Sequence, residues 1–321
     1  MRSVGQSVRK KDSAALLSGK PVYTEDVSPK NCLQVVILRS PHAHAMIEEI
    51  DVSRALKAPG VACALTYHDV PDIRFTQAGQ TYPEFSPYDR LILDRHLRCV
   101  GDPVAIVAAA TREQAEAAIR RIRVKYQILP AILDVKTAKD NPVCIHPEEN
   151  WRALVPCGAD NRRNLVAEGR DESGDVEAEL AACDIIIEQD YSTLANQQAM
   201  METFRASTQL DAYGRLTVIS STQVPFHVRR NVATALGIPK NQVRVIKPRI
   251  GGGFGAKQTM VCEVYPAIVT MKTGLPAMIV YTREESQTIS SPRHAMNIHV
   301  RLGATKDGVI RAVDMFTLSN S

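Results

Sequence analysis

The sequence predicts a mixed α+β fold built in two domains. A continuous apolar run at residues 104–110 indicates a buried strand, and the stretch 111–122 after it repeats small and aliphatic residues at helical spacing. In the second half, pairs of strand-like runs flank the turn sequences 211–214 and 307–308, which are typical of hairpins. A chain of 321 residues is long enough to bury two hydrophobic cores.

The first half predicts an N-terminal arm at residues 1–16 and a domain at residues 17–135. Thr111 and Gln114 form a capping-box pattern at the start of the helix. Another strand follows this helix, so we interpret residues 104–129 as a β-α-β unit. The other elements expected in this domain are strands at 32–38, 47–50 and 61–66, a short helix at 53–57, and a loop at 70–90.

The second half predicts a linker at residues 136–174 and a domain at residues 175–321. The linker is polar, contains proline and glycine, and has no clear periodicity. A helix at 226–236 is indicated by Gly237 and Pro239 just after its end. Because the last expected strand ends with nothing to cover it, we expect a fragment, a split subunit or a truncated reading frame. The other expected elements are a helix at 175–182 and strands at 185–193, 207–210, 216–221, 297–305 and 309–318.

Composition argues against several classes of protein. The net charge of +4 is small and no dense block of lysine and arginine occurs, so we expect neither nucleic acid nor a membrane surface as a partner. No apolar run approaches the length of about 18 residues that a transmembrane helix needs. The polar N-terminus lacks the apolar core of a secretory signal. The seven cysteines include no C-x-x-C pair, which favours buried thiols in a reducing cytoplasm over an iron–sulfur or zinc site.

The most distinctive stretch is the glycine-rich loop, residues 250–258. It lies between an expected strand at 243–246 and a helix-like run at 259–272. Glycine permits positive φ and close approach of another molecule, and backbone N–H groups at a helix N-terminus attract anions. The loop therefore predicts a site for a phosphorylated or oxyanionic ligand.

Two familiar patterns fit this loop imperfectly. A Walker A loop needs glycine and a hydroxyl where Ala256 and Gln258 stand, so ATP hydrolysis is set aside. The dinucleotide pattern Gly251-x-Gly253-x-x-Ala256 is satisfied, but no acidic residue is convincingly placed downstream. Nicotinamide-dinucleotide binding and a purely structural turn both remain open.

Two further polar positions lie in apolar surroundings. Thr222-Gln223 ends a strand just before a helix, where the amide either donates to an oxo or phosphate group or acts as a structural cap. Glu202 follows Met200-Met201, and its spacing alone does not reveal a role.

Several segments along nearly the whole chain resemble one known family. The pair formed by Ser221-Thr222-Gln223 and Gly251-Gly252-Gly253-Phe254-Gly255 is the most specific, and the others are 19–26, 39–44, 59–61, 101–105, 126–130, 174–176, 236–239 and 293–294. Together they resemble the molybdenum-binding subunit of the xanthine dehydrogenase / aldehyde oxidoreductase family of molybdenum hydroxylases, most of all the bacterial xanthine dehydrogenases. The resemblance implies an N-terminal α/β hammerhead domain and the first part of a molybdopterin-binding domain, incomplete at the C-terminus.

The resemblance also implies roles for individual residues. Gln223 is expected to hydrogen-bond the molybdenum oxo group, and the cofactor is expected to contact Gly252, Gly253, Phe254 and Gly255 beside the metal. The pterin dithiolene holds the molybdenum, so no side chain is expected to ligate it. Gln258 and Glu202 are candidate substrate contacts, and Gln258 stands where animal xanthine oxidoreductases carry a substrate-orienting glutamate.

The family's remaining machinery is expected outside this sequence. The general-base glutamate and a second cofactor-clamping segment are expected beyond Ser321, in a C-terminal remainder of the molybdenum subunit, so the chain alone is predicted to be inactive. The pterin is expected in its cytosine dinucleotide form. The [2Fe–2S] clusters and FAD are expected on separate partner subunits.

The function implied is oxidation of a purine, hypoxanthine or xanthine, to urate with oxygen taken from water. The alternative within the family is hydroxylation of an aldehyde or of an N-heterocycle such as nicotinate. Alternatives of other classes are a non-catalytic scaffold fragment that binds partner subunits and an NAD-dependent dehydrogenase that uses the glycine-rich loop.

Overall fold

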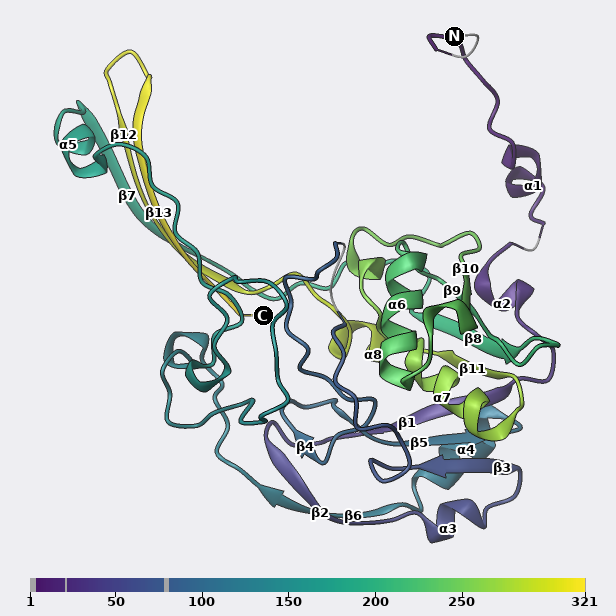
Figure 1. The fold of residues 1–321 in the computed structure, drawn as a ribbon. Helices are drawn as coiled ribbons and strands as arrows, with labels where there is room; N and C mark the ends of the chain where they lie inside the picture. The colour runs from purple at the N-terminus through teal and green to yellow at the C-terminus, as the bar shows by residue number, and fades with distance from the viewer. Residues whose placement is uncertain (1–3, 21, 78–80, 321) are drawn as a thin grey trace.

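The computed structural model describes residues 4–20, 22–77 and 81–320, whose strands form three sheets (Figure 1). Parts of the expected arm and of the loop at 70–90, together with Pro21 and Ser321, lie outside the described residues. The largest sheet has seven strands in the order β10-β9-β8-β11-β1-β5-β3. Its strands are β1 (Leu33–Arg39), β3 (Val61–Leu65), β5 (Pro103–Ala109), β8 (Arg205–Leu210), β9 (Leu216–Ser220), β10 (Val243–Ile246) and β11 (Ala277–Val280).

The predicted β-α-β unit is wrong in its topology. Its first strand, β5, pairs antiparallel with β1 on one side and with β3 on the other, so neither edge is free for another strand. The strand after the helix, β6 (Arg123–Ile128), pairs instead with β2 (Ala45–Asp51) in a separate sheet with β4 (His96–Leu97). The two strands of the expected unit therefore lie in different sheets.

The helix of this region forms as predicted. Helix α4 (Arg112–Ile119) begins after Thr111, whose side chain accepts a hydrogen bond from the Gln114 backbone N–H in a complete capping box. Ala115 and Ala118 are fully buried and pack against strands of the large sheet. Shorter helices in this half are α1 (Ser13–Leu17), α2 (Thr24–Val27) and α3 (Ser53–Leu56). Helix α1 falls largely within the expected arm.

The second half follows the sequence in most of its elements, but one helix starts later than predicted, and strand β11 and helix α8 (Arg283–Thr288) were not predicted. Strands β8 and β9 form the expected hairpin, and β10 runs parallel to β9. Helix α6 (Pro225–Leu236) ends at Gly237, which has φ of +67°. Helix α7 (Val264–Thr273), however, begins later than the helix-like run predicted from residue 259. The Glu263 carboxylate accepts hydrogen bonds from the N–H groups of Val261 and Cys262, at 2.9 and 3.0 Å, which holds this stretch outside the helix.

The final hairpin belongs to a third sheet. Strand β12 (Met296–Ala304) lies between β7 (Ile185–Thr193) and β13 (Ile310–Ser319), and all three run antiparallel. This sheet projects away from the rest of the molecule, with helix α5 (Val176–Ala181) packed against it (Figure 1). Many of its apolar side chains are more than half exposed, among them Ile186, Ile187, Tyr191, Met315 and Phe316.

The main hydrophobic core joins both halves of the chain. Val35 and Phe75 from the first half pack in the same cluster as Val218 and Ile268 from the second. Parallel pairing of Leu33 in β1 with Ala277 in β11 makes the large sheet continuous across the predicted domain limits. Those limits stay a prediction. Among the described residues, no helix has both the length and the apolar character needed to span a membrane.

The remaining elements are short. Residues 136–174 fold back on the first half, since Arg74 Nε donates to Asn150 Oδ1 at 2.6 Å and the Tyr88 N–H donates to the Arg152 carbonyl at 2.8 Å. Helix α8 (Arg283–Thr288) follows β11, and single 3₁₀ turns are η1 (Val135–Thr137), η2 (Asn161–Arg163), η3 (Lys240–Gln242) and η4 (Ala256–Gln258).

Candidate cofactor site

The glycine-rich loop leaves the end of β10 and continues into the 3₁₀ turn η4. Gly252 and Gly255 have φ of +96° and +93°, a region that side chains with a Cβ rarely adopt. Phe254 also has positive φ, +50°, and its side chain is 70% exposed. A large aromatic residue held in this conformation at the surface is typical of strain at a functional site.

The two other glycines are needed for close packing. A Cβ on Gly251 would lie 2.6 Å from the Cβ of Glu202, and a Cβ on Gly253 would lie 2.4 Å from Oε1 of Gln223. Both distances are shorter than atoms can approach without displacement. The structure therefore brings Glu202 and Gln223 directly against the loop.

Gln223 is held by hydrogen bonds to both its backbone and its side chain. Its backbone N–H donates to the Lys257 carbonyl at 2.8 Å, and its Oε1 accepts from the Gly255 N–H at 3.2 Å. Because Oε1 is occupied by the loop, the NH₂ group on the other arm of the amide is the one placed to donate to a ligand. The expected hydrogen bond from this NH₂ group to an oxo group stays a prediction.

Part of the loop offers unused backbone donors. Within the described residues, the N–H groups of Gly252, Gly253 and Phe254 donate to no other residue. Successive N–H groups of this kind form a concave nest that attracts an anion. Gln223 lies against this loop, and backbone N–H groups beside a carboxamide suit an oxygen-rich, anionic cofactor such as a pterin dinucleotide.

The same loop lacks the geometry of a nicotinamide-dinucleotide site. In that fold, the phosphates meet the N-terminus of a helix that starts directly after the glycines. Here η4, which begins at Ala256, and an irregular stretch separate the glycines from the start of α7 at Val264. The pattern Gly251-x-Gly253-x-x-Ala256 is therefore a coincidence of spacing.

Glu202 is buried beneath the loop, where its carboxylate binds three donors. Oε2 accepts from the Gly251 N–H at 2.8 Å, from Lys257 Nζ at 2.8 Å and from Ser221 Oγ at 2.5 Å. Burial raises the pKa of the Glu202 carboxyl, but the hydrogen bonds from Lys257, Ser221 and Gly251 outweigh it and leave the pKa below its ordinary value. The carboxylate is thus ionised at neutral pH.

Gln258, the second candidate substrate contact, ends η4 and is half-buried. Its backbone N–H donates to the Gly255 carbonyl at 3.1 Å, which fixes its place beside the loop. The substrate roles of Gln258 and Glu202 both stay predictions.

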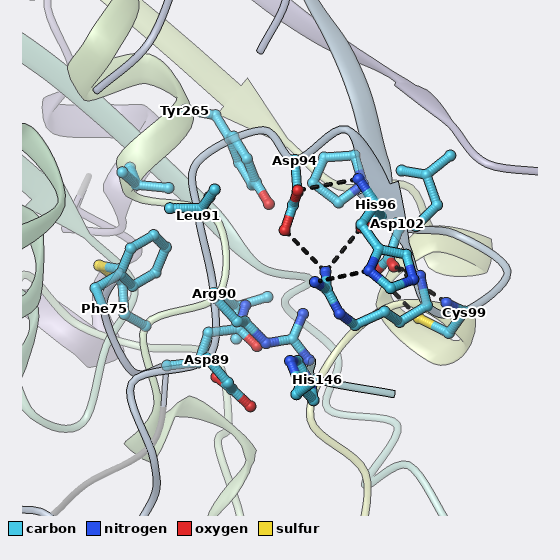
Figure 2. Close-up of a pocket in the computed structure, with 17 residues that line it drawn as sticks. Phe75, Asp89, Arg90, Leu91, Asp94, His96, Cys99, Asp102, His146 and Tyr265 are labelled. Atoms are coloured by element: carbon cyan, nitrogen blue, oxygen red, sulfur yellow. Dashed lines mark hydrogen bonds and ion pairs between the residues drawn. The ribbon is translucent and has the colours of Figure 1, made fainter. Parts of the chain in front are cut away.

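A separate cavity of about 90 Å³ lies next to the start of α7 (Figure 2). Asp94, His96, Cys99 and Asp102 lie together on one side of it, and Arg98 joins Asp94 at 2.8 Å. Burial, with the positive charge of Arg98, lowers the pKa of His96 to about 4, so this ring is neutral at pH 7. The sequence did not predict this cluster, because its ion pairs arise from the folding of an irregular segment.

The fold and the loop together define an α+β protein with a glycine-rich loop at the end of a strand of its large sheet. Comparison with known families shows which class of protein this is. Residues 159–321 match the molybdopterin cofactor-binding domain, and residues 18–130 match the a/b hammerhead domain of aldehyde oxidase and xanthine dehydrogenase. The chain belongs to the xanthine dehydrogenase / aldehyde oxidoreductase family of molybdenum hydroxylases, which confirms the family predicted from the sequence.

Individual relatives differ in their substrates. The chain is 38% identical to a probable hypoxanthine oxidase, XdhD, of Escherichia coli K12, over 99% of this chain and 36% of that protein. It is 34% identical to the nicotinate dehydrogenase large molybdopterin subunit of Eubacterium barkeri, over 97% of this chain and 69% of that subunit. The aldehyde oxidoreductase of Desulfovibrio gigas shares its fold, with a TM-score of 0.82 over 98% of this chain and 34% of that one, at 24% identity.

Proposed function

We propose that this chain is the N-terminal, cofactor-binding part of a molybdenum hydroxylase that oxidises hypoxanthine or xanthine to urate. The observation that carries the proposal is that the Gln223 amide lies against the glycine-rich loop, in which the N–H groups of Gly252, Gly253 and Phe254 have no acceptor among the described residues. When bound, the molybdenum–pterin group supplies the two-electron oxidation and the transfer of oxygen derived from water. The protein's part is to bind and orient that group.

The loop residues have distinct tasks in this proposal. The N–H groups of Gly252, Gly253 and Phe254 donate to the cofactor, and Gly255 keeps the backbone close to it. The NH₂ group of Gln223 donates to an oxygen ligand of the metal. The pterin is in its cytosine dinucleotide form, and its dithiolene, not a side chain, holds the molybdenum.

Purine is the favoured substrate because XdhD, named as a probable hypoxanthine oxidase, is 38% identical over nearly the whole chain. Gln258 is placed beside the loop, and its amide both donates and accepts, which suits the edge of a purine. The second candidate is an N-heterocycle such as nicotinate. It is favoured by the Eubacterium barkeri subunit, because this chain spans 69% of that subunit's length and only 36% of XdhD.

In this proposal, further polypeptides complete the enzyme. The general-base glutamate and a second cofactor clamp come from a C-terminal remainder of the molybdenum subunit, so the chain alone is inactive. The exposed apolar side chains of the β7–β12–β13 sheet support such a partner, since a surface of this kind is usually covered. In this proposal the enzyme is cytoplasmic, and separate subunits that carry [2Fe–2S] clusters and FAD accept its electrons.

The test is reconstitution. The chain is purified alone and together with the polypeptides that complete the subunit, and molybdenum and released cytidine monophosphate are measured. We expect both in stoichiometric amounts in the completed protein, with urate formed from hypoxanthine and xanthine. Turnover of nicotinate or aldehydes only would reject the purine assignment. Absence of molybdenum with tight NAD binding would reject the function, and absence of both would favour the scaffold.

A further inference from the structure

Glu202 and Lys257 hold the two ends of the glycine-rich loop. Glu202 binds Gly251, the first glycine of the loop: its Oε2 accepts from the Gly251 N–H, and its own backbone N–H donates to the Gly251 carbonyl at 3.1 Å. Lys257 lies at the other end, and its Nζ reaches the same carboxylate oxygen at 2.8 Å. The hydrogen bonds between Gly251 and Glu202 and the ion pair between Glu202 and Lys257 together link the two ends of residues 251–257.

The same pair fixes the Gln223 segment against the loop. Lys257 Nζ also donates to Ser221 Oγ at 2.6 Å, and Ser221 Oγ in turn donates to Glu202. The Lys257 carbonyl accepts from the Gln223 backbone N–H at 2.8 Å and from Thr222 Oγ1 at 3.3 Å. The distance between the Gln223 amide and the free N–H groups of the loop thus depends on where Lys257 sits.

The burial of this pair is unusual for surface-loop residues. The Lys257 side chain is 1% exposed and that of Glu202 is 8% exposed. Lysine and glutamate are almost never buried to this degree unless they are paired. A buried ion pair is a poor source of net stability, because desolvation offsets the attraction between the charges, whereas it does fix geometry.

We propose that Glu202 and Lys257 are a positioning pair that closes the glycine-rich loop and sets the Gln223 amide and the loop N–H groups at cofactor-binding distance. The ligand's identity rests on the proposed function. The closure itself rests only on the contacts above. In this role Glu202 acts through the loop and does not touch substrate. The neutralising ammonium also keeps the carboxylate's charge from repelling an anionic ligand in the nest.

The decisive variant replaces both partners at once. Glu202→Leu with Lys257→Met keeps the volume but removes both charges, and such replacements commonly restore the stability that a single replacement loses. If the pair only stabilises the fold, the double variant keeps wild-type order in the loop. If the pair positions the loop, the loop becomes less ordered although the chain stays folded, because the Gly251 N–H loses its acceptor and Lys257 no longer reaches Glu202.

Two measurements separate these outcomes. Hydrogen exchange by mass spectrometry on this chain reports the order of residues 250–258, and molybdenum content reports cofactor binding by the completed subunit. We expect faster exchange in the loop and about a tenfold or greater fall in molybdenum content, the effect typical of removing a residue that orients a metal site. The matched control is Arg301→Met in β12, which removes the ion pair to Asp314 far from the loop and should change neither measurement.

Every result bears on the proposal. Wild-type exchange in the double variant overturns loop closure, and wild-type molybdenum content overturns the link between closure and the cofactor. If the double variant does not fold by circular dichroism, Glu202→Gln, which keeps the shape and an acceptor, is judged by the same two measurements. Wild-type protein without molybdenum rejects the proposed function instead, and the exchange data then decide loop closure alone.

Discussion

Replacing Gly253 by alanine is the sharpest test of the site, because it places one methyl group against the Gln223 amide. The added Cβ would lie 2.4 Å from Oε1 and 2.8 Å from the amide carbon of Gln223. The amide is the end of a flexible side chain, so we expect it to move away. It then loses the hydrogen bond from the Gly255 N–H, now 3.2 Å long.

The cost follows from these contacts. Overpacking of this kind costs about 1–3 kcal/mol, and loss of one hydrogen bond costs about 1 kcal/mol. Movement of the Gln223 side chain relieves part of this cost. We expect the free energy of unfolding to fall by about 1–2 kcal/mol, which urea denaturation followed by circular dichroism measures. The larger effect is on molybdenum content of the completed subunit, because the displaced amide no longer donates to the cofactor.

Gly169→Ala is the matched control. A Cβ at Gly169 would meet no atom within 4 Å, so this change should leave both the urea midpoint and the molybdenum content unchanged or slightly improve stability. If Gly253→Ala matched this control in both measurements, the close approach of Gln223 to the loop would be wrong as described here.

Three further predictions concern the first half of the chain. Burial lowers the pKa of His96 to about 4 and that of His146 to about 3. Below pH 6.5 the unfolded chain therefore binds more protons than the folded one, and the free energy of unfolding should fall by roughly 2–3 kcal/mol per histidine as pH falls towards 4. A urea midpoint independent of pH in this range would contradict this prediction. Thr111→Ala removes the α4 cap and should cost about 1 kcal/mol in urea unfolding, whereas no change would show that the cap is dispensable. Arg98→Ala leaves the partly buried Glu148 carboxylate with Arg74, at 3.6 Å, as its arginine partner and should cost about 1–3 kcal/mol in the same assay, and no loss would show that water replaces the arginine.

Local signals in the sequence were sufficient where neighbours in the chain decide the structure. Helix α6 carries its own start and stop, with Pro225 in its first turn and Gly237 in the left-handed conformation just after it, and its limits were predicted within a residue. Strand β7 was likewise predicted with its observed limits. Such elements need no information from distant segments.

Distant contacts decided the features that the sequence did not reveal. The start of α7 depends on the Glu263 carboxylate, which binds backbone N–H groups and also accepts from Ser220 Oγ in β9 at 2.7 Å. The β-α-β prediction failed because β1 and β3 pair with the two edges of β5, and neither partner lies in the segment from which the unit was predicted. Glu202 and Lys257 are 55 residues apart, although two opposite charges in apolar or glycine-rich runs are a usable signal of a buried pair.

The topology of the sheet explains why the site residues meet although they are scattered along the chain. Strand β10 runs parallel to β9, so the glycine-rich loop after β10 and Gln223 after β9 emerge at the same edge. Strand β8 is antiparallel to β9, with Ala206 opposite Ser220, so Glu202, which precedes β8, reaches that edge as well. Three adjacent strands thus deliver the nest, the amide and the carboxylate beneath them to one place. Spacing in the sequence does not reveal this arrangement, but a correct strand order would have been enough to predict it.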